Sequence, residues 1–255
     1  MAHRLRCELI GMHVEESELL RLANLPVARQ ISLLSGKVSS PQGRAMELDM
    51  QAQRVLIRND FVSHMHRAKL TWSFRVERGR VAAALLSAAS GMDLLVVGKA
   101  GRSVVAGRRL GSVPRGILSG EHGLVLVVAH GARLRGPLVV VYDGSSAAQA
   151  GLMLAAGLTD WHDGHIEVLL VADRPETIAE LKQGALGSLA RLGALARCST
   201  LIMPGVPSMV RAVESTGRGT VVLPAGGGFF HREMLLSVLD RLENAVFVVQ
   251  GVDRT

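Results

Sequence analysis

The sequence has few of the residues that bring covalent cross-links, aromatic stacking or membrane insertion. Its two cysteines, Cys7 and Cys198, cannot form the disulfide framework of small secreted domains. Aromatic residues make up 3% of the chain, so the core must be built from Leu, Val, Ala and Met. No run of about 18 apolar residues lacks charge or glycine, and no sustained apolar segment follows the basic start at residues 1–6. We therefore expect a cytoplasmic protein without a membrane span.

The motifs of several enzyme classes are also absent. There is no Gly-x-Ser-x-Gly, so Ser145 or Ser146 is better interpreted as the N-cap of the helix that follows than as a nucleophile. The Walker pattern Gly-x4-Gly-Lys-Ser/Thr is missing, which favours Lys99 as a charge at the rim of a site. Two histidine groups lack the three or four convergent ligands of a metal site. These groups are His64 with His66, and His162 and Asp163 with His165. We predict no catalytic residue and no resident metal.

The positive charge is spread along the chain. The net charge is +7 and the pI about 10.4, values that fit a nucleic-acid partner. However, the basic residues are not interleaved with aromatic residues, as they are in single-strand binders. The densest cluster consists of Arg102, Arg108, Arg109 and Arg115. We interpret this cluster as a cationic rim around an anion site and expect no nucleic-acid partner.

The anion site itself is indicated by a glycine motif between two apolar strands. The strand 94–97 runs into Gly98, Gly101 follows, and Gly111-Ser112-Val113 comes before a second strand at 124–128. Glycine lets backbone N–H groups approach a phosphate without a Cβ in the way, and a helix that begins beside such a loop favours an anion. The motif therefore predicts a phosphate-binding loop, although the glycines could also serve only as turn residues.

The chain divides into two series of alternating strands and helices, separated by a polar, glycine-bounded break at 129–136. This pattern predicts an α/β protein with buried parallel sheets, divided into a first half (residues 1–130) and a second half (residues 137–255). In the first half we expect strands at 8–14, 70–76, 94–97 and 124–128, and helices at 41–68 (with Pro41 in first position) and 80–90; Glu15, Glu16 and Glu18 should lead a helical turn toward Ala23. In the second half we expect strands at 137–142, 166–171, 199–203, 220–223 and 245–249, and helices at 145–159, 175–192, 207–215 and 231–243.

The spacing Gly-x2-Gly-x9-Gly-Ser after a strand resembles the nucleotide-binding signature of universal stress proteins. The segment 141–145 resembles the first strand and adenine-side loop of that family, and 11–15 resembles the end of its second strand. The resemblance implies two tandem Rossmann-like domains with open parallel sheets of strand order 3-2-1-4-5. It further implies that an adenine nucleotide, ATP, acts as a regulatory ligand in stress response, with Mg²⁺ only as the nucleotide's companion.

The resemblance divides the binding residues unevenly between the halves. In the first half it assigns them to Val14, Val97, Gly98, Gly101, Arg102, Gly111, Ser112 and Val113. The first half lacks the first strand of the family, and with it the aspartate that faces adenine. The second half has that aspartate, Asp143, but its loop at 223–228 has no Gly-Ser pair nine residues on. We therefore expect the second half to be unable to hold a triphosphate in the manner of the family.

The missing first strand would be central in the sheet, where a gap would leave two rows of backbone groups unpaired. Three explanations are open. The native chain could be longer, with Met1 inside its first helix. A strand could be inserted by the second half or by a partner chain. The second and fourth strands of the first half could also pair directly.

The resemblance leads us to expect the two halves to pack through their last strands, 124–128 and 245–249, as a pseudo-dimer, with a homodimer also open. An alternative function is that of a stress-related interaction or scaffold protein that binds no nucleotide, and its protein partner is not identified by the sequence. A hydrolase that acts on adenine nucleotides is a third hypothesis, for which no base or nucleophile is visible.

Overall fold

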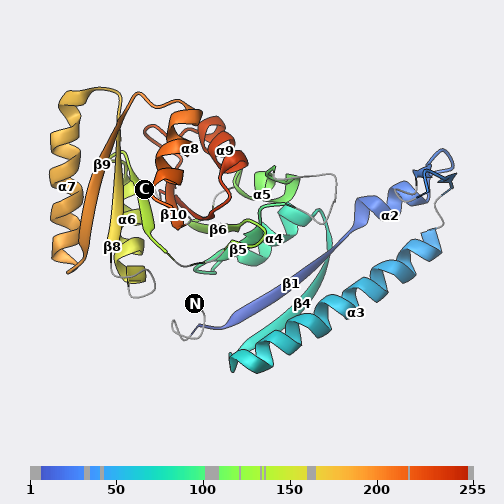
Figure 1. Cartoon of the computed structure of the whole chain (residues 1–255). Helices are drawn as coiled ribbons and strands as arrows, with labels where there is room; N and C mark the ends of the chain where they lie inside the picture. Colours follow the sequence, from blue (N-terminus) through green and yellow to red (C-terminus); the bar gives the residue numbers. More distant parts are fainter. Residues whose placement is uncertain are drawn as a thin grey trace. The chain divides into compact units, whose positions relative to one another are not determined.

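The structure is a computed structural model of the chain, and it describes residues 7–31, 35–40, 43–100, 109–120, 122–132, 134, 136–159, 165–217 and 219–251. The chain divides into two compact units, residues 1–88 and residues 89–255 (Figure 1). Each unit is described by itself. Both are built on β-strands covered by helices, and the larger contains a mostly parallel sheet, as the sequence predicts.

The 89–255 unit contains a seven-stranded sheet of order β5-β6-β11-β10-β7-β8-β9. All neighbours are parallel except β6 and β11, which are antiparallel. The strands are β5 (Leu95–Gly98), β6 (Leu124–Val128), β7 (Leu138–Tyr142), β8 (His165–Ala172), β9 (Leu195–Ile202), β10 (Thr220–Ala225) and β11 (Ala245–Gln250). Within the second half, the order β9-β8-β7-β10-β11 is the 3-2-1-4-5 order that the resemblance implies.

Helices follow the strands of this unit. They are α5 (Ser112–Ile117), α6 (Ser146–Leu158), α7 (Ile178–Arg191) after the short 3-10 helix η2 (Pro175–Thr177), α8 (Val206–Ser215) and α9 (Arg232–Arg241). Right-handed crossovers place α6 and α7 on one face of the sheet and α8 and α9 on the other. Figure 1 shows α8 beside α9. Because both faces are covered, β7, β10 and nearly all of β11 are buried and read as continuous apolar runs.

The start of α6 shows how local sequence sets these boundaries. Gly144 has a φ of +83°, a left-handed conformation that L side chains rarely adopt, and it turns the chain away from β7. The Ser145 Oγ then accepts a hydrogen bond from the Ala148 N–H at 3.2 Å. The predicted N-cap is therefore confirmed at Ser145.

The two halves of the sequence meet at the antiparallel pair β6–β11. Leu126 lies opposite Phe247, and Val127 lies opposite Val246. These side chains are at most 2% exposed, so the junction belongs to the core. The expected pairing of the last strands is confirmed, and it joins β5 and β6 of the first half to the sheet of the second.

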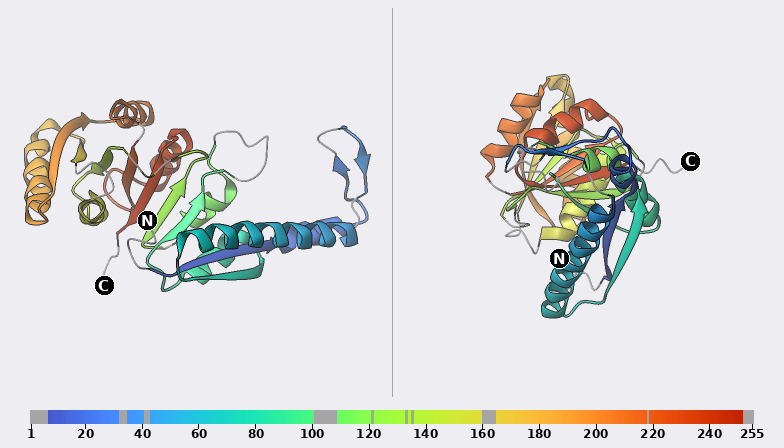
Figure 2. Two further views of the ribbon diagram at one scale, coloured as in Figure 1. Left: turned by 60° about the horizontal axis from the view of Figure 1, so that its bottom comes forward. Right: turned by 90° about the vertical axis from the view of Figure 1, so that its right-hand side faces the viewer.

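The 1–88 unit is built on a two-stranded parallel sheet, β1 (Leu9–Glu16) with β4 (Trp72–Gly79). The long helix α3 (Gly43–Ala68) runs along this sheet (Figure 2). The remaining elements are α2 (Ser17–Ala23), α4 (Val81–Ala89), and the short strands β2 (Gln30–Ile31) and β3 (Val38–Ser39), which pair antiparallel. Pro41 lies outside the described residues.

Gly11 allows α3 to pack closely on β1. A Cβ at Gly11 would lie 2.7 Å from the Phe61 ring and 2.9 Å from the Phe74 ring, so any side chain there would displace them. Phe61 of α3 also packs edge-on against Trp72 at a centroid distance of 5.6 Å. The chain therefore concentrates three of its scarce aromatic residues where this small sheet meets its helix.

The prediction that Glu15 and Glu16 lead a helix is wrong, because β1 continues through both residues and α2 begins at Ser17. Pairing with β4 extends the strand as far as Glu16 opposite Gly79. The Glu15 side chain is buried, and its Oε2 accepts a hydrogen bond from the Arg78 Nε at 2.8 Å. Arg54 of α3 lies 3.4 Å from the Glu15 Oε1. Two arginines therefore stabilise a carboxylate that local sequence alone assigns to a helix start.

Direct pairing of the second and fourth strands of the first half is not observed. Among the described residues β1 pairs with β4, and β5 pairs with β6. The five strands of the second half all lie in the seven-stranded sheet. Because β1 and β5 belong to different units, the explanations of the missing strand stay predictions.

We predict that Phe247→Ala lowers the free energy of unfolding by about 3–5 kcal/mol, because it removes a buried ring from the β6–β11 junction. Urea denaturation of the purified chain measures this change. Phe229→Ala is the matched control, since Phe229 is only partly buried. A loss at Phe247 no larger than that of the control would contradict a core role for the junction.

Candidate functional site

The glycine loop lies between the end of β5 and the start of α5. The Lys99 N–H donates to the Val128 carbonyl at 2.8 Å, which continues the β5–β6 ladder beyond Gly98. The Gly111 N–H donates to the Lys99 carbonyl, also at 2.8 Å. The structure therefore brings the two ends of the loop together, with Val97 and Gly98 on one side. The predicted residues on the other side are Gly111, Ser112 and Val113.

At neither described glycine of the loop does the backbone adopt a conformation that only glycine favours. A Cβ at Gly98 would meet only the Ala100 carbonyl oxygen, at an ordinary contact distance of 3.5 Å. Gly111 is the N-cap of α5 with a φ of −69° and a ψ of 169°, an extended conformation open to any residue. Among the described residues, the space beside Gly98 is thus open to a ligand that approaches the backbone. The helix α5 has six residues, so its dipole adds little.

The position of three predicted site residues relative to the described loop ends is not tested. Gly101 and Arg102 lie outside the described residues, as does Arg108 of the predicted cationic rim. Val14 lies on β1 in the 1–88 unit, opposite Glu77 of β4. These residues stay predictions from the sequence.

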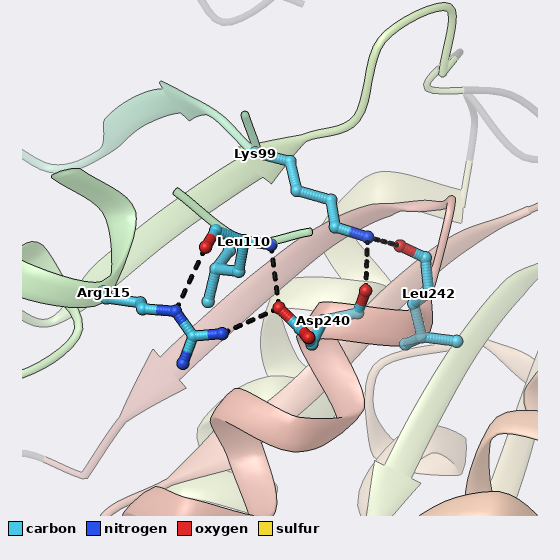
Figure 3. A network of polar contacts seen from close by, with 5 residues as sticks. All are labelled: Lys99, Leu110, Arg115, Asp240 and Leu242. Atoms are coloured by element: carbon cyan, nitrogen blue, oxygen red, sulfur yellow. Dashed lines mark hydrogen bonds and ion pairs between the residues drawn. The ribbon is translucent and has the colours of Figure 1, made fainter. Parts of the chain in front are cut away.

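Lys99 is anchored in the protein rather than placed at a rim (Figure 3). It is only 4% exposed, and its Nζ donates to the carbonyl oxygens of Leu242 at 2.7 Å and Asp240 at 3.1 Å. These carbonyls close helix α9, whose C-terminal end carries partial negative charge. The expectation of a rim charge is wrong because the last turn of α9 offers a buried ammonium group two acceptors.

Arg115 belongs to the same network. Its terminal guanidinium nitrogen forms an ion pair with the Asp240 Oδ1 at 2.7 Å, and its Nε donates to the Leu110 carbonyl at 3.1 Å. The Asp240 Oδ1 also accepts the Leu110 N–H at 2.8 Å. Figure 3 shows Lys99 and Arg115 reaching the end of α9 from the two sides of the loop. Arg115 therefore fixes the loop on α9 instead of serving as a free cation, which corrects the prediction for this residue.

In the second half the carboxylate of Asp143 is held by the protein itself. Its Oδ1 accepts hydrogen bonds from the Ser145 N–H at 3.0 Å and the Ser145 Oγ at 2.6 Å. Its Oδ2 accepts the Phe229 N–H at 3.0 Å. Gly228 has a φ of +58°, and a Cβ there would overlap the same Oδ2. The loop after β10 thus closes directly onto the residue that the resemblance assigns to adenine.

Two findings concern features that we do not expect from the sequence, a metal site and a membrane span. Within the residues that the structure describes, no three His, Cys, Asp or Glu side chains are grouped to hold a metal ion. His162 and Asp163 are outside that set. No helix in the described part of the chain is long and apolar enough to cross a membrane.

Comparison with known proteins places this architecture. No family model matches the sequence, and no curated protein matches it. A solved universal stress protein from Archaeoglobus fulgidus DSM 4304 superposes with a TM-score of 0.65 at 16% identity, covering 98% of both chains. The chain has the fold of universal stress proteins. A functionally unknown protein from Pseudomonas aeruginosa PAO1 is also similar, with a TM-score of 0.61 at 14% identity over 98% of this chain and 95% of that one.

The universal stress protein fold puts both loops in context. Each loop follows the strand that is fourth in the family's numbering, which is β5 in the first half and β10 in the second. The two ends of the first-half loop are joined by the hydrogen bond from Gly111 to Lys99 and are fixed on α9, with open space at Gly98 among the described residues. The second-half loop is closed by Asp143. The two halves therefore have different loops. The glycine spacing indicates this difference in the sequence, but the sequence does not reveal the contacts of Lys99 with α9.

We predict that Lys99→Met lowers the free energy of unfolding by about 1–3 kcal/mol, because two buried carbonyls at the end of α9 lose their donor. Urea denaturation tests this. Lys37→Met is the matched control, since Lys37 is exposed in the other unit and should change stability little. Equal effects of the two changes would contradict a structural role for Lys99.

We also predict that the phenol of Tyr142 titrates above its ordinary pKa of 10.0, because burial, and secondarily the charge of Asp143, raises the pKa. The raised pKa favours the neutral phenol in the fold, so its contribution to stability is present below the ordinary pKa and is lost as pH rises through the folded pKa. Tyr142 is the sole tyrosine, so ultraviolet titration reports it directly. Asp143→Asn should move the midpoint down toward 10.0. An unchanged midpoint in this variant would contradict the assigned influence of Asp143.

Proposed function

We propose that the chain acts in stress response by binding an adenine nucleotide, ATP, as a regulatory ligand at the glycine loop of the first half. The observation that carries the proposal is the joining of the loop ends, in which the hydrogen bond from Gly111 to Lys99 brings Gly98 beside the start of α5. Backbone amides in such a turn are suited to hold phosphate oxygens.

The phosphate side fits this ligand. The open position at Gly98 leaves room for an oxygen to approach the backbone, and Ser112 is exposed at the other end of the loop. Because Lys99 and Arg115 are engaged with α9, the described part of the site would act mainly through backbone N–H groups rather than through these two charges. On sequence grounds, Gly101 and Arg102 would complete the grip, and Mg²⁺ would enter only with the nucleotide.

The adenine side is less complete. The described first-half residues contain no counterpart of Asp143, and Val14 alone is assigned to the base. In the second half, Asp143 already accepts three hydrogen bonds from its own loops. The engagement of Asp143 supports a single nucleotide per chain, bound at the first half. We propose that this nucleotide is not turned over catalytically. No described side chain is arranged as a base with a nucleophile at the loop.

A second function, that of an interaction protein without a nucleotide, is favoured by the same engaged charges. Three described cations lie near the loop in sequence: Lys99, Arg109 and Arg115. Arg109 is exposed, whereas Lys99 and Arg115 contact α9 and stabilise the protein rather than bind a phosphate. Under this hypothesis the loop is a structural contact between the halves, and its glycines are turn residues.

Retained nucleotide separates the two functions. We predict that protein purified without added ligand releases adenine nucleotide on denaturation, and that Gly111→Asp abolishes this. The new carboxylate would repel phosphate, yet aspartate is a favourable N-cap, so α5 should still form. Chromatography of the supernatant provides the measurement.

Gly187→Asp is the matched control, because it adds the same charge at an exposed glycine of α7. It should leave nucleotide content unchanged. Folded wild-type protein that neither retains nucleotide nor binds added ATP would reject the first function in favour of the second.

A further inference from the structure

The strand β5 forms one outer edge of the seven-stranded sheet. Among the described residues it pairs with β6 and with no other strand. The Lys99 N–H points to β6, and successive residues of a strand in a parallel ladder alternate between its two neighbours. Leu95 and Val97 therefore face β6, whereas the backbone groups of Val96 and Gly98 face the outer edge.

The second half shows what lies at the corresponding edge. There the fourth strand, β10, pairs with β11 on one side and with β7 on the other. The register with β7 joins Thr220 with Leu138, Val221 with Val139, and Val222 with Val140. A parallel pairing of three residues thus completes β10, whereas its shorter counterpart β5, of four residues, has no second neighbour among the described strands.

The edge of β5 also lacks the features that protect natural edge strands. Such strands carry charges or proline that discourage further pairing. The residues of β5 are Leu-Val-Val-Gly, and the side chain of Val96 is 55% exposed. The opposite edge of the same sheet, β9, carries Arg197, Ser199 and Thr200. Within the described part of this unit, the β9 edge therefore carries one charge, Arg197, whereas the β5 edge carries none.

We propose that the outer edge of β5 is a docking site for an extended apolar segment of a partner polypeptide, which adds in parallel as β7 adds to β10. Main-chain hydrogen bonds to Val96 and Gly98 supply the attraction, as in other cases of strand addition. We expect the segment to be apolar, because the outward face of β5 carries the exposed side chain of Val96 and no charge. The internal counterpart of this partner is the sequence Leu138–Tyr142, which is entirely buried.

A synthetic peptide that copies residues 136–146, with lysines added at both ends for solubility, is the probe. Amide hydrogen exchange of the full chain is followed residue by residue by nuclear magnetic resonance. Without the peptide, the Val96 and Gly98 amides should exchange at least tenfold faster than the Val97 and Lys99 amides. A saturating concentration of the peptide should slow Val96 and Gly98 by at least tenfold.

Three variants test which backbone groups take part in the pairing. The Thr220 N–H donates to the Pro137 carbonyl, so residues 137, 139 and 141 face β10, and a peptide with Val139→Pro and Val141→Pro should give no protection. In the protein, Val96→Pro removes an outward donor of β5 and should abolish the effect. Thr200→Pro removes an outward donor on the β9 edge, where proline is tolerated, and should preserve the effect.

The proposal is overturned by either of two results. Val96 and Gly98 amides as protected as Val97 in the chain alone would show that the edge is already covered. Absence of added protection at saturating peptide, or equal protection by the proline peptide, would show that the edge does not accept a strand. Because Gly98 also belongs to the proposed nucleotide loop, both measurements use protein freed of nucleotide, and the Val96 amide, which lies outside that loop, decides between the outcomes.

Discussion

The antiparallel pairing of β6 with β11 is the constraint on which the 89–255 unit depends. It places the fourth and fifth strands of the first half in one sheet with the complete five-stranded series of the second. Because Leu126 and Phe247 are both buried in that pairing, the halves share a core instead of touching at a polar surface. The first-half glycine loop consequently lies against α9, and its geometry is determined by residues more than a hundred positions away.

Two of the positive charges beside the loop therefore have a structural role. Lys99 donates to the carbonyls at the C-terminal end of α9, and Arg115 pairs with Asp240. These two cations therefore stabilise the fold rather than a bound phosphate. In return the loop is fixed at both ends before any ligand arrives, which lowers the ordering cost of binding. The loop of the second half is closed, because the Asp143 carboxylate accepts the Phe229 N–H and Gly228 packs against the same carboxylate. One chain thus holds an open and a closed version of the same strand–loop element.

Much of this arrangement is predictable from local sequence. Apolar runs with glycine at their ends locate β5, β6, β7 and β11 to within about a residue, and Ser145 marks the start of α6. Long-range partners are not predictable in this way. Nothing beside Glu15 in the sequence indicates Arg54 and Arg78, and nothing beside Lys99 indicates the end of α9. Both residues change role because a distant element supplies the counter-charge or the acceptors, and periodicity and spacing carry no information about such elements.

The central claim is that the open loop of the first half, and not the closed loop of the second, receives the nucleotide. Titration of the labelled protein with ATP, observed through backbone amide chemical shifts, tests it most directly. The account predicts saturable shifts at Gly98, Gly111, Ser112 and Val113, with the amides of residues 226–229 unchanged. Shifts confined to residues 226–229, or none at either loop at saturating ATP, would contradict it.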